Sequence, residues 1–396
     1  MITFEEAFQI TTKQVVLLPS ERIHLEDALG RILAEDIFSD MNMPPFDKSA
    51  VDGYACRMED LTANTKNELA LEIIETIPAG VIPQKKISTG QCSKIMTGSM
   101  LPEGCDSVVM IEDTERVDET RVRLKTTGAI RNICYTGEDI KNGDMLLNKG
   151  KLMAPQHIGV LAVAGAVNPL VYRKVKVAVI STGNELVEPE ELPGPSKIRN
   201  SNAGQLMAQV TEAHALVKYY GIAKDDEKSL DQKITLALES NDVVILTGGA
   251  SMGEFDYVPG VLEKNGAEIL IENIAIQPGK PTVFAKINGR FIFGLPGNPV
   301  SSFVIFKMLV RPFLMKLMGN TEEFPVIILP MGKNYTRKNT SRKSMIPVKI
   351  IKGALFPVEY HGSAHINSYA DADGIISLEI GKNSLTKGEL VNVRQI

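Results

Sequence analysis

Residues 175–182 read VKVAVIST, residues 242–249 read DVVILTGG, and residues 289–297 read GRFIFGLPG. Each is a continuous apolar run that ends at glycine or next to one, which is typical of a buried parallel strand. Between these runs, SNAGQLMAQVTEAHA (201–215) and DDEKSLDQKITLALES (225–240) show helical periodicity behind Asn or Asp caps. This alternation predicts an α/β domain with a doubly wound parallel sheet over residues 175–320.

The segments on the N-terminal side of this domain predict a helical framework made of residues 1–40 and 145–174. Thr3 and Glu6 have the spacing of a capping box, and five apolar residues recur at helical spacing: Leu25, Ala28, Leu29, Ile32 and Leu33. APQHIGVLAVAG (154–165) has Pro155 near its first turn and Gly165 at its end, as a helix does.

Two further segments are predicted to be rich in β-strands. The two prolines and the Asp-Gly step of MPPFDKSAVDGYA (43–55) end any helix, and the short runs LALEII, SKIMTG, DSVVMIE and RVRLKT follow. Residues 41–144 therefore predict an inserted β-rich module. After Phe324 the runs VIILPM, MIPVKII, ALFPVEY, GIISLEI and ELVNVRQI predict a C-terminal β-barrel or sandwich over residues 321–396.

The composition excludes several classes of protein. The formal net charge of this 396-residue chain is -5, which argues against a nucleic-acid surface because phosphate binding needs a concentrated basic face. The N-terminus lacks the basic and apolar regions of a signal peptide, so we expect a cytoplasmic protein. Lys307 and Arg311 interrupt the apolar residues 300–318, which predicts a buried or docking helix and no membrane span.

Cysteine and histidine spacing gives little support for a structural metal site. Cys56, Cys92, Cys105 and Cys134 include no C-x-x-C pair, which favours reduced core or surface thiols. His361 and His365 are four residues apart, but the Gly-Ser-Ala between them is typical of a turn, so a metal pair there is the weaker interpretation.

The candidate ligand site lies where the three apolar strands end, because open parallel sheets bind ligands beyond the carboxyl ends of their strands. Glycine at these turns lets the backbone approach an anion closely. One such loop is weak evidence, but three in one domain predict a cradle for a phosphate or a pterin. Its candidate residues are Ser181, Thr182, Gly183, Gly248, Gly249, Ser251, Gly253, Pro296, Gly297, Asn298 and Pro299.

Charged residues accompany these loops. Glu185, Asp225, Asp226 and Asp256 predict a Mg²⁺ site beside the phosphate cradle, although Asp225 and Asp226 suit a helix cap equally well. Lys280 stands between Gly279 and Pro281, a rigid turn that places one ammonium group for an anionic substrate. A solvated surface lysine is the alternative interpretation.

The motifs together resemble the molybdopterin molybdenumtransferase family, which includes bacterial enzymes and the gephyrin E domain. The resemblance spans nearly the whole chain and rests on FDKSAVDGYA, KIMTGSMLPEG, GEDI, STGNEL, TGGASMGEFDY, QPGKPTVFAK and GLPGNPVSSF, in that order. It implies four domains: the helical framework, the inserted module, an α/β domain similar to molybdopterin-adenylylating proteins, and a C-terminal β domain. It also implies a homodimer with a site completed by the inserted module of the second subunit.

The resemblance implies that adenylylated molybdopterin is cleaved with Mg²⁺, that AMP leaves, and that molybdenum from molybdate enters the dithiolene. Carried over by motif, the inserted module contributes Asp52, Thr97 and Asp139, and the C-terminal domain contributes Ser363. The α/β domain contributes Glu185, Asp225 or Asp226, Asp256 and Lys280, with Glu185, Asp225 and Asp256 as the metal ligands. Contacts with molybdopterin adenylyltransferase and with apo-molybdoenzymes are also implied.

Two residues depart from the family pattern. Asn184 replaces the aspartate of STGDEL, which removes one metal ligand, and Gln277 replaces a lysine three residues before Lys280. Two alternatives to a molybdenum insertase stay open. One is a molybdopterin adenylyltransferase, because its α/β domain has much the same glycine loops at the strand ends, although the additional domains argue against it. The other, which the two departures keep open, is a scaffold that carries the cofactor without catalysis.

Overall fold

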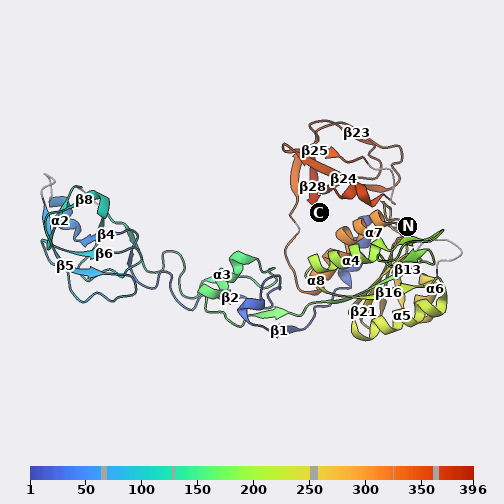
Figure 1. Cartoon of the computed structure of the whole chain (residues 1–396), viewed down its shortest axis with the longest axis horizontal. Helices are drawn as coiled ribbons and strands as arrows, with labels where there is room; N and C mark the ends of the chain where they lie inside the picture. The colour runs from blue at the N-terminus through green and yellow to red at the C-terminus, as the bar shows by residue number, and fades with distance from the viewer. Residues whose placement is uncertain (64–68, 127–129, 250–256, 324, 360–364) are drawn as a thin grey trace. The chain divides into compact units, whose positions relative to one another are not determined.

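The computed structural model describes residues 1–63, 69–126, 130–249, 257–323, 325–359 and 365–396 (Figure 1). The chain forms two compact units. The large unit contains Met1–Glu35, Lys149–Pro155 and Asn168–Ile396, and the inserted unit contains Asp36–Asn148 and Gln156–Val167. The inserted unit therefore includes residues 36–40, 145–148 and 156–167, which the sequence pattern assigns to the framework.

The large unit is built on a six-stranded sheet in the order β16 (Leu216–Ala223), β13 (Lys176–Thr182), β17 (Val243–Thr247), β21 (Arg290–Leu295), β20 (Val283–Ile287) and β18 (Glu268–Ile271). The first four strands are parallel, which confirms the prediction for the three apolar runs. The last two strands differ from the predicted parallel arrangement, because β20 is antiparallel to both of its neighbours, β18 and β21. Asn288 and Gly289, both with positive φ, form the two-residue hairpin turn that reverses the chain.

Helices cover both faces of this sheet (Figure 1): α4 (Ser201–Glu212), α7 (Pro299–Ile305) and α8 (Arg311–Leu317) one face, α5 (Glu227–Ser240) and α6 (Val258–Lys264) the other. Alternate residues of β13 point to opposite cores. Val177 and Val179 join the core of α4, whereas Ala178 and Ile180 join the core of α5. Asn200 caps α4 and Asp226 caps α5, so the predicted doubly wound arrangement and both predicted caps are confirmed.

The apolar residues 300–318 form a nearly continuous helix in which a π-helical turn, η3 (Phe306–Val310), joins α7 to α8. Lys307 is only 5% exposed, and its Nζ lies 2.6 Å from Oε2 of Glu212. The prediction of a buried helix is thus confirmed. Among the described residues, no helix is long and apolar enough to cross a membrane.

The C-terminal part of the large unit is a second six-stranded sheet, which confirms the predicted β domain. It contains β22 (Ile327–Pro330), β24 (Lys343–Ile351), β25 (Ala354–Pro357), β26 (Gly374–Leu378) and β28 (Leu390–Gln395). Its sixth strand, β19 (Ile276–Gln277), precedes β20 in the chain and pairs with β24. The short strands β23 (Tyr335–Thr336) and β27 (Ser384–Leu385) form a separate pair.

The N-terminal residues are less helical than their spacing predicts. Helix α1 (Phe4–Lys13) has the predicted capping box of Thr3 and Glu6. Residues 25–33 contain only a 3-10 turn, η1 (Leu25–Asp27), so the predicted helix there is wrong. Gly30 has φ +71°, which turns the chain, and Ile32 and Leu33 are then buried through bridges to the extended segments around residues 152 and 171. Nearby, β1 (Ser20–Arg22) pairs with β12 (Leu170–Tyr172).

The inserted unit is rich in β-strands, as predicted. Its main sheet has the order β7 (Ser107–Met110), β4 (Gly53–Cys56), β6 (Gln91–Ile95), β5 (Ala70–Ile77), β9 (Arg121–Leu124) and β8 (Thr114–Arg116). Two small pairs accompany it, β2 (Ile37–Phe38) with β11 (Met145–Leu147) and β3 (Lys48–Ser49) with β10 (Ile133–Cys134). The predicted helix before Gly165 is α3 (Pro155–Val163). All four cysteines are free, and Cys56 and Cys92 lie in the core of this unit.

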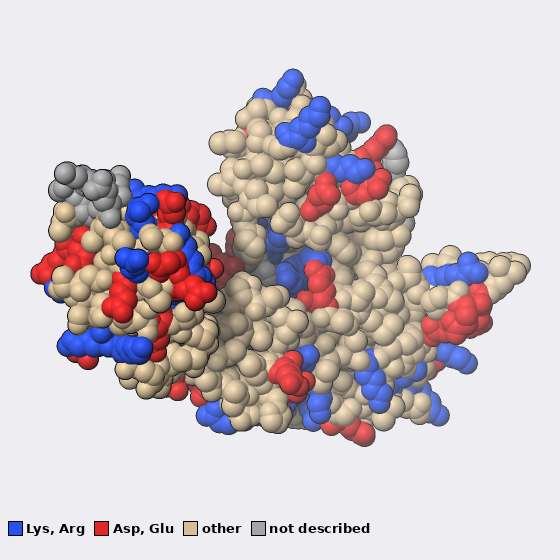
Figure 2. Space-filling model, turned by 60° about the vertical axis from the view of Figure 1, so that its left-hand side comes forward, with Lys and Arg blue, Asp and Glu red and all other residues tan. Residues whose placement is uncertain are grey.

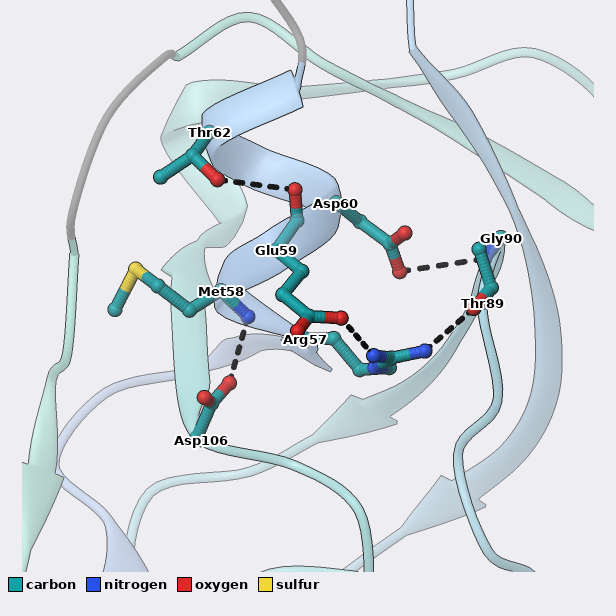
Figure 3. Close-up of polar contacts among 8 residues, drawn as sticks. All are labelled: Arg57, Met58, Glu59, Asp60, Thr62, Thr89, Gly90 and Asp106. Atoms are coloured by element: carbon teal, nitrogen blue, oxygen red, sulfur yellow. Dashed lines mark hydrogen bonds and ion pairs between the residues drawn. The ribbon is translucent and has the colours of Figure 1, made fainter.

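Polar side chains attach the short helix α2 (Met58–Ala63) to the loops around it (Figure 3). Asp106 Oδ1 accepts a hydrogen bond from the Met58 amide at 2.6 Å, which satisfies a donor at the start of the helix. Asp60 Oδ2 accepts one from the Gly90 amide at 3.2 Å, and Arg57 bridges Glu59 and Thr89. These contacts stabilise a helix that is too short to persist by itself.

Figure 2 shows Lys and Arg side chains and Asp and Glu side chains in small separate groups on a face that is mostly uncharged. No single large basic patch covers that face, in agreement with the small negative net charge of the chain.

Candidate functional site

The structure brings the three glycine loops together at one cavity of about 600 Å³ in the large unit. Thr182 and Gly183 line it from the end of β13, Gly248 and Gly249 from the end of β17, and residues 296–299 from the end of β21. Because these strands are parallel and adjacent, their carboxyl ends meet at one edge of the sheet. The loops therefore lie where the sequence pattern predicts; the cavity is called the glycine-loop pocket below.

Glycine at position 248 is required by the close packing of two loops. Its φ is +94°, and a Cβ added there would lie 2.3 Å from the carbonyl oxygen of Thr182. A Cβ on Gly297 would touch the Cα of Gly248 at 3.5 Å, so the third loop also packs closely. A larger residue at position 248 would push the loops apart.

Two of the glycine amides are not directed at a ligand. The amide of Gly183 donates to the carbonyl of Ala223 at 3.4 Å, and that of Gly248 donates to the carbonyl of Leu295 at 3.1 Å. This differs from the expectation that the glycines serve by offering their amides. At these two positions, the absent Cβ is what shapes the pocket.

Two carboxylates line the pocket. Asp225 Oδ1 accepts from the Thr182 hydroxyl at 2.8 Å, and its Oδ2 accepts from the Asn184 amide at 2.8 Å. The side chain of Asn184 accepts in turn from the Asp225 amide at 3.3 Å, so the residue that departs from the family pattern helps to orient Asp225. Glu185 is exposed and folds back over Gly183, where a Cβ would lie 2.7 Å from both of its carboxylate oxygens.

The neighbouring Asp226 has a different place. It lies outside the pocket lining, and its Oδ1 accepts from the Ser229 amide at 2.8 Å at the start of α5. Of the two aspartates, Asp225 therefore lines the pocket and Asp226 caps α5. No group of three His, Cys, Asp or Glu side chains in the described part of the chain is arranged to hold a metal ion.

Ser181 lies beneath the pocket, which corrects the prediction that it contacts substrate. It is fully buried, and its hydroxyl donates to Asn200 Oδ1 at 3.2 Å. Asn200 Nδ2 donates to the Tyr219 hydroxyl at 2.8 Å, and that hydroxyl donates to Glu188 at 2.9 Å. Burial, with this hydrogen bond to Glu188, raises the pKa of the Tyr219 phenol. The chain of hydrogen bonds secures the start of α4.

The start of α4 also contributes pocket residues that the sequence pattern does not predict: Arg199, Asn200, Ser201 and Asn202. Asn202 is 9% exposed, and its Nδ2 donates both to Thr247 Oγ1 and to the carbonyl of Gly297, each at 2.7 Å. It thereby ties α4 to the ends of β17 and β21. The signal for these residues is the strand-to-helix step at 198–201, where β15 (Ile198–Arg199) pairs with β14 (Leu186–Val187).

Lys280 and Gln277 occupy different surroundings. Lys280 is exposed; its carbonyl accepts from the amides of Ile274 and Thr282, and the adjacent Pro281 lines the glycine-loop pocket. Gln277 lines a second cavity of about 790 Å³. That cavity also has cationic and amide side chains in its wall, namely Lys333, Asn334, Arg337, Lys338 and Asn339.

The candidate residues of the inserted unit fall into one pair and one separate residue. Asp52 Oδ1 accepts from the amide and the hydroxyl of Thr97, at 2.7 and 2.9 Å. The Thr97 amide, and then its hydroxyl, hold the pKa of the Asp52 carboxyl below its ordinary value. Asp139 is exposed, and its amide donates to the carbonyl of Met43 at 3.1 Å.

Four candidate site residues lie outside the described residues: Ser251, Gly253, Asp256 and Ser363. The same holds for His361 of the histidine pair.

Comparison with known proteins gives matches along the chain. The MoeA N-terminal region (domain I and II) matches residues 2–165, a probable molybdopterin binding domain matches residues 178–316, and the MoeA C-terminal region (domain IV) matches residues 332–396. The molybdopterin molybdenumtransferase of Staphylococcus epidermidis is 36% identical over 397 residues, which cover 99% of this chain and 95% of that protein. The corresponding Staphylococcus aureus protein is 34% identical over the same length.

Solved structures agree with these matches. The molybdopterin biosynthesis MoeA protein from Pyrococcus horikosii is 34% identical with a TM-score of 0.81, and covers 100% of this chain and 99% of its own. The MoeA protein from Pyrococcus horikoshii OT3 is 27% identical with a TM-score of 0.85 and covers 100% of both chains.

Proposed function

The chain belongs to the molybdopterin molybdenumtransferase family, and from that premise we propose that its glycine-loop pocket binds the phosphate-bearing part of adenylylated molybdopterin. The protein is a transferase of molybdenum cofactor biosynthesis that inserts molybdenum into molybdopterin. In the proposed reaction, water hydrolyses the phosphoanhydride, so that one P–O bond forms as another breaks and AMP leaves. The two dithiolene sulfurs then replace an oxygen ligand of molybdate, which leaves as water with the two thiol protons.

The convergence of three strand ends and one helix start on a single cavity carries the proposal. The 12-residue helix α4 begins at Ser201, which lines the pocket, and the start of a helix is positively polarised. Gly248 and Gly297 let the loops pack closely enough for backbone groups to form the wall. A cavity of about 600 Å³ also lies within the range of small-molecule sites.

The pocket suits Mg²⁺ together with a substrate. Glu185 and Asp225 both line it, and magnesium sites beside phosphates commonly use one or two carboxylates, with water and phosphate oxygens as the other ligands. Bound there, Mg²⁺ supplies positive charge that offsets the negative charge of the phosphoanhydride. Asp256 remains the proposed third carboxylate by family resemblance.

The protein's own residues position these groups before any ligand arrives. Thr182 and Asn184 hold both oxygens of Asp225, so its carboxylate keeps one orientation. Asn202 joins the other two loops to α4. This preorganisation lowers the cost of ordering the site when the substrate binds.

Molybdate is the second substrate, and the cavity around Gln277 suits a tetrahedral oxyanion. Its wall combines the cationic groups of Lys333 and Lys338 with amide side chains, which donate hydrogen bonds. Gln277→Lys restores the family's charge, so it should tighten molybdate binding in equilibrium dialysis. Unchanged or weaker binding would argue against molybdate in this cavity.

We also propose the finer features that the resemblance implies: a homodimer, a cytoplasmic location, and contacts with molybdopterin adenylyltransferase and apo-molybdoenzymes. The dimer is tested by light scattering of the purified protein. A mass that stays at one chain across the micromolar range would exclude it.

The central experiment supplies purified protein with adenylylated molybdopterin, Mg²⁺ and molybdate, and measures AMP release. We expect release that depends on protein and is abolished by EDTA. A scaffold that carries the cofactor would release no AMP. An adenylyltransferase would instead accumulate adenylylated pterin from ATP and molybdopterin.

A further inference from the structure

Arg199 is the one positively charged residue among the described residues that line the glycine-loop pocket. The described lining also includes two carboxylates, Glu185 and Asp225. Lys280, the cation that the sequence pattern favours, is exposed, as Arg199 is, but it lies outside this lining. A phosphoanhydride brings further negative charge into the same space, so a cationic side chain in the wall favours its binding.

The guanidinium of Arg199 is held in a way that leaves its outer nitrogens for a ligand. Its Nε donates to the carbonyl of Glu191 at 3.1 Å, and within the described part of the chain this is the one hydrogen bond that the side chain makes. The backbone around it is fixed as well, because β15 pairs with β14 through Val187 and Arg199. An anchored Nε fixes the plane of the guanidinium, whose two terminal nitrogens form a fork that matches two oxygens of a phosphate.

The position of Arg199 in the chain adds to this geometry. Asn200 caps α4, and Ser201 and Asn202 begin that helix and line the pocket. Arg199 and the positively polarised helix start therefore line the same cavity, and both favour an anion.

We propose that Arg199 binds a phosphate of the substrate in the glycine-loop pocket and is the cation that selects phosphate-bearing ligands there. This inference rests on the proposed function and adds to it a specific residue for the phosphate. The phosphate is either the adenylyl phosphate or the phosphate of molybdopterin, which have the same chemistry.

Calorimetric titration of the full chain with AMP, molybdopterin and adenosine tests the inference. Arg199→Gln should weaken binding of the phosphate-bearing ligand by about tenfold or more, because hydrogen bonds to charged groups are stronger than neutral ones. Adenosine has no phosphate, so its binding should not change. Arg199→Lys retains the charge without the fork and should fall between the wild type and Arg199→Gln. Weakened AMP binding identifies the adenylyl phosphate, and weakened molybdopterin binding identifies the pterin phosphate.

Lys197→Gln is the matched control. It removes the same charge two residues away, but Lys197 lies outside the pocket lining and its Nζ donates to the carbonyl of Asn184. Phosphate-ligand affinity should change by less than about threefold, because Lys197 does not line the pocket and screening weakens the effect of a charge that does not contact the ligand. The inference is overturned if Lys197→Gln weakens binding as much as Arg199→Gln does, if Arg199→Gln binds AMP and molybdopterin like the wild type, or if it weakens adenosine equally. Failure of the proposed function is a separate result, since it appears as wild-type protein that binds AMP without turning over adenylylated molybdopterin.

Discussion

Asp225→Asn should separate the part that this carboxylate plays in catalysis from the part it plays in stability. The asparagine carbonyl can still accept from the Asn184 amide, and its NH₂ can donate to the Thr182 hydroxyl, so both contacts of 2.8 Å can be retained in neutral form. Replacing two hydrogen bonds to a charged acceptor by two neutral ones costs about 1–2 kcal/mol of unfolding free energy. AMP release should fall much further, by about 100-fold or more, which corresponds to about 2.7 kcal/mol in the barrier.

Thr182→Val is the control for this prediction. It removes one of the two hydrogen bonds to Asp225 but leaves the carboxylate charge, and its stability loss should be similar, about 1–2 kcal/mol. We expect its AMP release to remain within several-fold of the wild type, with an unchanged dependence on Mg²⁺. The assay is AMP release at saturating substrate over a range of Mg²⁺ concentrations, with denaturant unfolding in parallel. If both variants lose turnover equally, or if Asp225→Asn retains wild-type turnover, the reasoning about the metal site is refuted.

Three further predictions concern the loops and the inserted unit. Gly248→Ala places a Cβ 2.3 Å from the carbonyl oxygen of Thr182 at φ +94°, so denaturant unfolding should show a loss of more than about 2 kcal/mol in the free energy of unfolding. Gly260→Ala is the control: its Cβ would meet nothing within 4 Å, so the change should be neutral or stabilising. Burial raises the pKa of the Cys92 thiol from 9.0 to about 12. Between these pH values the folded state retains a proton that the unfolded chain releases. The contribution of this thiol to the free energy of unfolding is therefore fully present below pH 9 and is lost as the pH rises towards 12. Cys92→Ala should reduce this slope of the unfolding midpoint, and an unchanged slope would contradict the assignment. Thr97→Val removes one hydroxyl donor, so an NMR titration should show the pKa of Asp52 moving up towards 3.8; no movement would show that the amide alone holds it down.

Predictions that depend on local sequence were confirmed where a local pattern and a tertiary requirement agree. The apolar strand 243–247 is parallel and buried, and Asp226 caps the helix that precedes it, because short-range hydrogen bonding and burial favour the same structure. The same reasoning failed for Ile32 and Leu33, whose helical spacing is real although both are extended and buried in the structure. Gly30 with its positive φ and the available partner strands decide that case.

The candidate site divides in the same way. Glycine after a buried strand indicates a turn at the ligand edge of a sheet, which locates Gly183, Gly248 and Gly297. Side-chain roles depend on which atoms meet, and spacing cannot supply that. Ser181 and Thr182 are adjacent residues of strand β13, yet Ser181 is buried beneath the pocket. Successive residues of a strand point to opposite faces of the sheet, so the side chain next to a pocket residue can point into the core.

The sequence by itself determined the family, the α/β domain with its glycine loops, and the β-rich character of the inserted and C-terminal parts. These properties depend on residue order, periodicity and turn chemistry, all of which are local. The tertiary structure alone decided that Asp225 enters the pocket, that Asn202 joins three elements, and that Arg199 rather than Lys280 lines the wall. The hydrogen bonds of Asp225 to Thr182 and of Asn202 to Thr247 and Gly297 join residues that are 43, 45 and 95 positions apart, and only the folded chain brings those residues within hydrogen-bonding distance.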